Sequence, residues 1–125
     1  MNPVDSCGWI EYFIGGRNAD EYAVPLSDKE NLLVPTICIY EVFKHVVRYG
    51  DEAKGLGVVA VMMQGQVVDI DAKIAVNAAR IAIDFGLAMA DSVILATARQ
   101  YSATIWTQHK HFKNHDGVNY LEKLN

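Results

Sequence analysis

The sequence has few cysteines, no long apolar run and no recognisable export signal, and each absence excludes a class of protein. Only Cys7 and Cys38 occur, both in apolar segments, so we expect reduced thiols and not a disulfide framework. The apolar run Val58–Met63 is far shorter than the roughly 20 residues that cross a bilayer. The stretch Met1–Asp5 has neither the basic start nor the apolar core of a secretory signal. We therefore expect a cytoplasmic protein with no membrane segment.

A surplus of basic charge is also missing. The chain has 11 Lys and Arg against 15 Asp and Glu, a net charge of −4, so nucleic-acid binding would need a local patch. The basic residues available for such a patch are Lys44, Arg48, Lys110 and Lys113. With 125 residues, 51% hydrophobic and 21% charged, and no repeats or linkers, residues 1–125 are expected to form a single globular domain.

Apolar periodicity predicts that short strands alternate with helices. The expected strands are 3–5, 31–35, 66–70, 103–107 and 117–121, and the expected helices are 9–14, 18–29, 37–48, 51–63, 72–85 and 87–101. This alternation predicts an α/β domain with a parallel sheet and right-handed crossovers. Ligands of such sheets bind beyond the carboxyl ends of the strands, where the strand order reverses.

Three carboxylates and one threonine stand out against this framework. Asp5 follows the first strand and Asp91 lies near the start of an apolar helix; each taken alone is best interpreted as a helix cap. Glu41 lies in a largely apolar helix and needs a partner, such as Lys44 or His45 one turn on, or a function. Thr107 ends the fourth strand.

A parallel sheet can bring these acids to one edge, where they would repel one another unless a divalent cation neutralised them. Hard oxygen ligands with open water positions suit Mg²⁺ or Mn²⁺. Such a site activates water and stabilises charge on a phosphate, as in metal-dependent nucleases.

Three segments carry a family resemblance: Asp5-Ser6-Cys7-Gly8-Trp9-Ile10-Glu11-Tyr12-Phe13, Tyr40-Glu41-Val42-Phe43-Lys44 and Met89-Ala90-Asp91-Ser92-Val93-Ile94-Leu95-Ala96-Thr97-Ala98. Together they resemble the motifs of PIN-domain ribonucleases, and most of all VapC-type toxins of toxin–antitoxin pairs. The resemblance implies a three-layer α/β/α domain with a four- to five-stranded parallel sheet, and Mg²⁺- or Mn²⁺-dependent cleavage of RNA. It implies that Asp5, Glu41 and Asp91 bind the metal and that Thr107 orients water or ligand. It also implies a homodimer and a cognate antitoxin that occludes the site.

The sequence departs from the family pattern at His109. The family usually has Thr-x-Asp after the fourth strand, and here the run is Thr107-Gln108-His109. Imidazole can ligate Mn²⁺ but is a poor partner for Mg²⁺ and supplies no negative charge. Three interpretations stand: a site with altered metal preference, a weakened or inactive domain, or a base change acquired in cloning that blunts a toxic activity. We expect a retained fold with reduced activity.

Two further hypotheses concern the last loop. Asp116 could supply the missing acid, although a position just before a parallel strand points to the far edge. His109, His111 and His115 permit a zinc site, since residues i and i+2 share a face in an extended loop. The alternative to an enzyme is an inactive PIN module that acts by binding an antitoxin or another protein.

Overall fold

The computed structural model describes residues 2–124, and its five strands are all parallel. They are β1 (Asn2–Pro3), β2 (Leu32–Pro35), β3 (Gln66–Val68), β4 (Ile105–Thr107) and β5 (Val118–Tyr120). Three strands pair in the order β1-β2-β3, and β4 pairs with β5. A bridge between Val4 and Trp106 joins β1 to β4, and the amide of Asp5 donates to the Trp106 carbonyl at 2.9 Å. The order across both parts is therefore β3-β2-β1-β4-β5, in agreement with the predicted parallel sheet.

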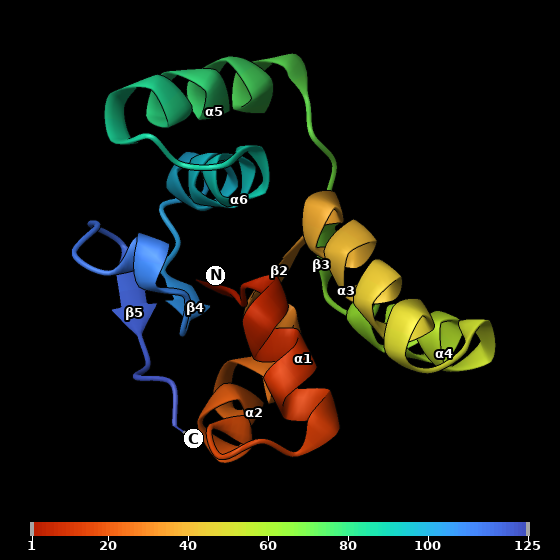
Figure 1. Cartoon of the computed structure of the whole chain (residues 1–125). Helices are drawn as coiled ribbons and strands as arrows, with labels where there is room; N and C mark the ends of the chain where they lie inside the picture. The colour runs from red at the N-terminus through yellow and green to blue at the C-terminus, as the bar shows by residue number, and fades with distance from the viewer. Residues whose placement is uncertain (1, 125) are drawn as a thin grey trace.

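Six α-helices accompany these strands and complete the predicted three-layer α/β/α arrangement. They are α1 (Ser6–Ile14), α2 (Ala19–Ser27), α3 (Thr36–Tyr49), α4 (Glu52–Met62), α5 (Ala72–Phe85) and α6 (Met89–Gln100), with short 3₁₀ turns η1 (Lys29–Asn31) and η2 (Lys110–Phe112). The helices associate in consecutive pairs, α1 with α2, α3 with α4, and α5 with α6 (Figure 1). The strands that carry the site lie between these pairs (Figure 1).

The core is built on β2 and α6. All four residues of β2 are buried, with Leu33 and Val34 fully inaccessible. In α6 every residue from Ser92 to Ala98 is buried, so this helix packs on more than the single stripe expected from its apolar spacing. Burying one such Leu, Ile or Val side chain stabilises the fold by about 1.5–3 kcal/mol. The burial fixes α6, and with it the position of Asp91 in its first turn.

Two aspartates cap helices in the structure, and the predicted helix start is right for one of them. The predicted helix 72–85 is observed as α5, because the Asp71 carboxylate accepts from the Ile74 amide at 2.8 Å and Gly86 ends the helix with φ of 69°. Asp5 likewise caps α1, where it accepts from the Ser6 amide at 2.8 Å, and α1 therefore begins three residues earlier than predicted.

The capping interpretation of Asp91 is wrong. Ala88 is the N-cap of α6 and no side chain caps this helix. The hydroxyl of Ser92 bonds to the Ala88 carbonyl at 2.9 Å, and the Asp91 carboxylate is left for other contacts.

The buried side chain of Asn18 joins the loop between α1 and α2 to the C-terminal part of the chain. Asn18, only 4% exposed, donates from Nδ2 to Gln108 Oε1 and to the Glu122 carbonyl, each at 2.9 Å. Its backbone amide donates to Glu11 Oε2 at 3.3 Å. The loop between α1 and α2 is thereby fixed against the segments that follow β4 and β5.

Two expectations about cysteine and membrane segments can be compared with the structure. Cys7 and Cys38 are both free thiols, and Cys38 is fully buried. Within residues 2–124 no single helix is long and apolar enough to cross a membrane; α5 and α6 reach that length and composition only as a pair bent by 118°.

Candidate metal centre

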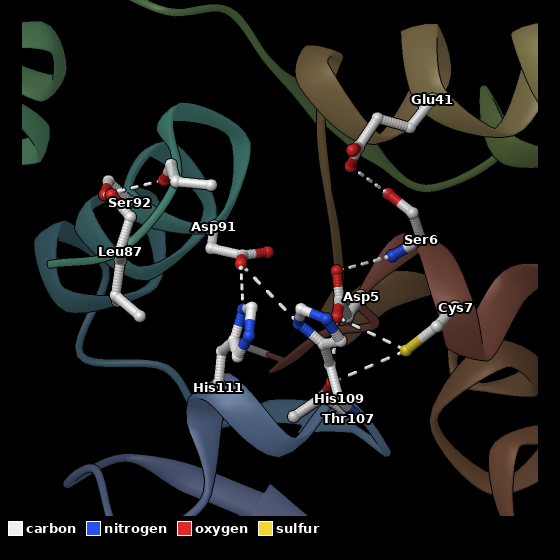
Figure 2. A network of polar contacts seen from close by, with 11 residues as sticks. Asp5, Ser6, Cys7, Glu41, Leu87, Asp91, Ser92, Thr107, His109 and His111 are labelled. Carbon is white, nitrogen blue, oxygen red and sulfur yellow. Dashed lines mark hydrogen bonds and ion pairs between the residues drawn. The ribbon is translucent and has the colours of Figure 1, made fainter. Parts of the chain in front are cut away.

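The candidate site lies where the strand order reverses, beyond the carboxyl ends of β1 and β4. Asp5 follows β1 and Thr107 ends β4, and the two side chains meet there (Figure 2). Thr107 donates from Oγ1 to Asp5 Oδ2 at 2.8 Å. Both residues are buried, Asp5 at 4% and Thr107 at 0% exposure, so this contact is a fixed feature of the site and not a surface encounter.

Asp5 is buried with several donors around it. The Ser6 amide donates to Oδ1 at 2.8 Å, and the Cys7 thiol donates to Oδ2 at 3.3 Å. Burial raises the pKa of Asp5, and the negative charge of Asp91 raises it further, while the hydrogen bonds act in the opposite direction. Burial also raises the pKa of the Cys7 thiol to about 12, so Cys7 remains a protonated donor.

Glu41 reaches the same place from α3. Its Oε1 accepts from the Ser6 hydroxyl at 2.7 Å, so Ser6 touches Asp5 with its amide and Glu41 with its side chain (Figure 2). Burial raises the pKa of Glu41, and the charges of Asp5 and Asp91 raise it as well. Among residues 2–124 Glu41 forms no ion pair with Lys44 or His45, so the one-turn partner suggested by the sequence does not explain this acid.

Asp91 approaches from the first turn of α6 and meets two histidines. Its Oδ2 lies 3.5 Å from Nδ1 of His109 and 3.3 Å from Nδ1 of His111. Its other carboxylate oxygen points away from the two imidazoles (Figure 2). The amide of His109 donates to Thr107 Oγ1 at 3.0 Å, so one hydroxyl connects the His109 backbone to the Asp5 carboxylate.

The structure thus brings Asp5, Glu41, Asp91, Thr107 and His109 together. The Asp91 charge raises the pKa of Asp5, and the charges of Asp5 and Asp91 raise the pKa of Glu41, as expected for carboxylates crowded without a counter-ion. A divalent cation would relieve this repulsion, and acid oxygens with imidazole nitrogens are ligands that such ions accept. The residues present fit a metal ion.

Sequence patterns assign no role to Ser6, and they group His111 with His115 as well as with His109. Ser6 lies within the first motif, but its contact with Glu41 spans 35 residues and depends on how α3 packs. His111 joins His109 at Asp91, whereas the His115 ring packs edge-on against Phe85 at 4.9 Å. The proposed histidine trio is therefore wrong in its third member.

Asp116 does not supply the missing acid. It is exposed and precedes β5, which runs parallel to β4, so it lies at the opposite edge of the sheet from Thr107.

A basic groove opens beside Glu41. It has a volume of about 200 Å³ and is lined by Tyr40, Glu41, Lys44, His45, Arg48 and Tyr49, all on α3. Lys113, another candidate for a basic patch, instead lies over the Tyr120 ring at 5.5 Å. The cations that line the groove with Glu41 are therefore Lys44 and Arg48.

The parallel sheet, with acids at the edge where the strand order reverses, defines the class of this protein: an α/β domain with a polar site whose residues fit a metal ion. Within that class the family model described as "PIN domain" matches residues 4–118. The chain belongs to the PIN-domain family, and the resemblance carried by its motifs is confirmed.

Solved structures share this fold over nearly the whole chain. A toxin–antitoxin complex from Klebsiella pneumoniae contains a chain with a TM-score of 0.84 and 21% identity, covering 99% of this chain and 100% of its own. A DNA-bound VapBC from Salmonella typhimurium gives 0.73 and 15%, covering 97% and 96%. Mycobacterium tuberculosis VapC20, described as a sarcin-ricin loop cleaving toxin, gives 0.69 and 12%, covering 86% of each chain. No curated protein sequence matches the chain.

Proposed function

We propose that this protein is a metal-dependent endoribonuclease toxin of a toxin–antitoxin pair, which hydrolyses RNA phosphodiester bonds with Mg²⁺ or Mn²⁺. The observation that carries the proposal is the convergence of three acids at one edge of the sheet. Ser6 joins Asp5 to Glu41, Thr107 binds Asp5, and Asp91 lies close enough for its charge to act on both other acids. His109 stands where the family usually has a fourth acid, and we expect activity to be reduced for that reason.

The residues of the site have two roles in the proposed reaction: some would bind the ion, and others hold these ligands in one orientation. Asp5, Glu41 and Asp91 would hold the ion, which when bound lowers the pKa of water and offsets charge on the phosphate. Thr107 keeps the Asp5 carboxylate in one orientation through its 2.8 Å hydrogen bond. Ser6 does the same for Glu41 at 2.7 Å. Ligands held in this way lose little freedom on binding, which favours a well-defined site.

The basic groove suggests how RNA would approach. Lys44 and Arg48 lie one and two turns beyond Glu41 on α3 and line the same groove. Cations in this position would bind phosphate oxygens and guide the strand toward the acids, although the net charge of the whole chain is −4. Tyr40 and Tyr49 offer rings on which bases could stack.

An antitoxin partner is part of the proposal, since several structures of the same fold are toxin–antitoxin complexes. A second, apolar groove of about 450 Å³ lies between α1, α3 and α4, and it shares His45 and Tyr49 with the basic groove. A peptide seated in the apolar groove would therefore extend directly into the one beside Glu41. Such a segment would occlude the RNA path.

We also propose a cytoplasmic homodimer. Free thiols at Cys7 and Cys38 are compatible with a reducing compartment. A third groove, about 380 Å³ and almost wholly apolar, lies between α5 and α6 and is lined by Ile70, Ala75, Ala78, Ala79, Ala82, Met89, Ser92 and Val93. An apolar surface of this kind is suited to a second copy of the chain.

The direct test is RNA cleavage by the purified protein with Mn²⁺. Asp5→Asn and Asp91→Asn should each lower cleavage at least about a hundredfold, because each removes a charged ligand. Asp116→Asn, on the opposite edge of the sheet, is the matched control and should cleave like the unaltered protein. Cleavage that survives both changes at Asp5 and Asp91 would refute the assignment.

The alternative function is that of an inactive module that only binds a partner. The variant His109→Asp distinguishes this module from a nuclease. Restoring the family's acid should raise Mg²⁺-supported cleavage at least about tenfold if the scaffold is a nuclease with one altered ligand. No gain, combined with no measurable binding of Mg²⁺ or Mn²⁺, would favour the binding module.

A further inference from the structure

Asp91 of the proposed acid site also belongs to a second cluster, which it forms with His109 and His111. One ligand atom from each lies within 4.8 Å of the other two, and the residues come from α6, the loop after β4, and η2 (Figure 2). One carboxylate oxygen of Asp91, the third acid of the proposed site, is directed toward the two imidazoles, and the other oxygen is directed away from them.

The two distances from Asp91 to the imidazoles match the ligand spacing of a small tetrahedral ion. Bonds of about 2.0–2.1 Å to a tetrahedral Zn²⁺ separate two ligand atoms by roughly 3.3–3.4 Å. Asp91 Oδ2 lies 3.3 Å from Nδ1 of His111 and 3.5 Å from Nδ1 of His109. The Nδ1 atom of His109 is buried and has no hydrogen-bond partner within residues 2–124, so this nitrogen is free to bind an ion.

His109 is held in place by its backbone, and His111 lies in the short turn η2 that follows it. The His109 amide donates to Thr107 Oγ1, and its carbonyl accepts from the amide of Phe112, which is fully buried. Although Nδ1 of His109 is itself buried, the two side chains are 40% exposed for His109 and 61% for His111, so the cluster lies at the surface. An ion could therefore enter from solvent, and a water or phosphate could occupy its fourth position.

We propose that Asp91, His109 and His111 bind a borderline transition-metal ion, with Zn²⁺ preferred over Mg²⁺. Two imidazole nitrogens and a single carboxylate favour Zn²⁺ in the affinity order of divalent metals, whereas Mg²⁺ prefers an all-oxygen set. A site with three protein ligands leaves the fourth position open, as zinc sites that act on water do. The replacement of the usual acid by His109 thus gives Asp91 a nitrogen-rich side, which selects a different metal from the one that the three acids select.

The test is calorimetric titration of chelator-treated protein with ZnCl₂ and, separately, with MgCl₂. We expect one Zn²⁺ per chain, bound at least about a hundredfold more tightly than Mg²⁺. His111→Ala should weaken Zn²⁺ binding at least about tenfold, because it removes a ligand but leaves Asp5, Glu41 and Asp91 intact. His115→Ala is the matched control, since that ring packs on Phe85 outside the cluster, and its Zn²⁺ affinity should not change.

A spectroscopic measurement on the unaltered protein tests the same ligands without depending on whether the variants fold. X-ray absorption at the zinc edge should show nitrogen and oxygen ligands at about 2.0–2.1 Å with scattering from two imidazole rings. Equal affinity for Mg²⁺ and Zn²⁺, an unchanged affinity in His111→Ala, an equal loss in His115→Ala, or a spectrum without imidazole would each overturn the proposal. The titrations contain no RNA, so their result is independent of whether the protein cleaves it.

Discussion

At the scale of single residues, the site is assembled by two hydroxyl groups. Ser6 contacts both Asp5 and Glu41, and Thr107 contacts both Asp5 and the backbone of His109. Each hydroxyl fixes a carboxylate whose pKa burial and neighbouring charge have raised. The protein therefore holds its acids in a position that is unfavourable for the metal-free fold.

This unfavourable burial predicts an effect of Glu41→Gln on stability. Glutamine keeps an oxygen that can accept from Ser6 but removes the charge that burial and Asp5 disfavour. Because Glu41 is only half-buried, solvent screening keeps the gain small, about 0.5–1 kcal/mol or 2–4 °C in Tm at pH 7 without metal. Thermal unfolding by circular dichroism measures it, with exposed Glu30→Gln as the control.

The pH dependence has a definite sign. Since folding raises the pKa of Glu41 above its ordinary value of 4.5, its contribution to stability is present below that value and is lost as pH rises through the folded pKa. The advantage of Glu41→Gln should therefore vanish below about pH 4.5. An advantage that instead grows on acidification would contradict burial and like-charge repulsion as the cause of the raised pKa.

The main acids of the site can be predicted from the sequence because they lie in recognisable motifs. Residue type, local pattern and family resemblance together point to Asp5, Glu41, Asp91 and Thr107, and the fold brings them together. Ser6 and His111 act through contacts that span 35 and 20 residues. Such contacts depend on helix packing and loop conformation, which no local pattern encodes, so the sequence does not reveal their partners.

At the scale of elements, prediction succeeds where the determinant is local. The bounds of α5 follow from Asp71 before it and Gly86 after it. By contrast, the last predicted strand, 117–121, shortens to Val118–Tyr120, because pairing with β4 decides where a strand ends. The capping interpretation fails for Asp91 because a first-turn acid has the same local signature whether it faces its own helix or a neighbour.

The buried Asn18 yields a prediction at this scale. Asn18→Ala removes both hydrogen bonds that tie the α1–α2 loop to Gln108 and to the Glu122 carbonyl. Leaving the buried Gln108 oxygen and the part-buried Glu122 carbonyl without this donor should lower the free energy of unfolding by about 1–3 kcal/mol, measured by urea denaturation. Asn31→Ala, at an exposed asparagine that bonds only to Asp28, should change it by less than about 0.5 kcal/mol. Equal losses in the two variants would argue against this role.

At the scale of the whole molecule, the apolar groove between α5 and α6 predicts self-association. Met89 lines it and is 72% exposed, so Met89→Glu should place a charge in the dimer interface and shift the protein toward monomer. Light scattering after size exclusion measures the mass. Leu56→Glu, at an exposed residue of α4 outside the groove, should leave the mass unchanged. A monomeric parent protein would contradict the proposed homodimer.

The single bridge between Val4 and Trp106 makes the sheet two half-sheets joined along one seam. Asp5 lies on that seam and crosses it twice, since its amide bonds to Trp106 and its carboxylate to Thr107. Glu41 belongs to one side of the seam, while His109 belongs to the other. A small displacement of β1 relative to β4 would separate the acids before either half of the sheet lost its helices. We therefore expect separation of these strands to lower the activity of this protein before it lowers the helix content.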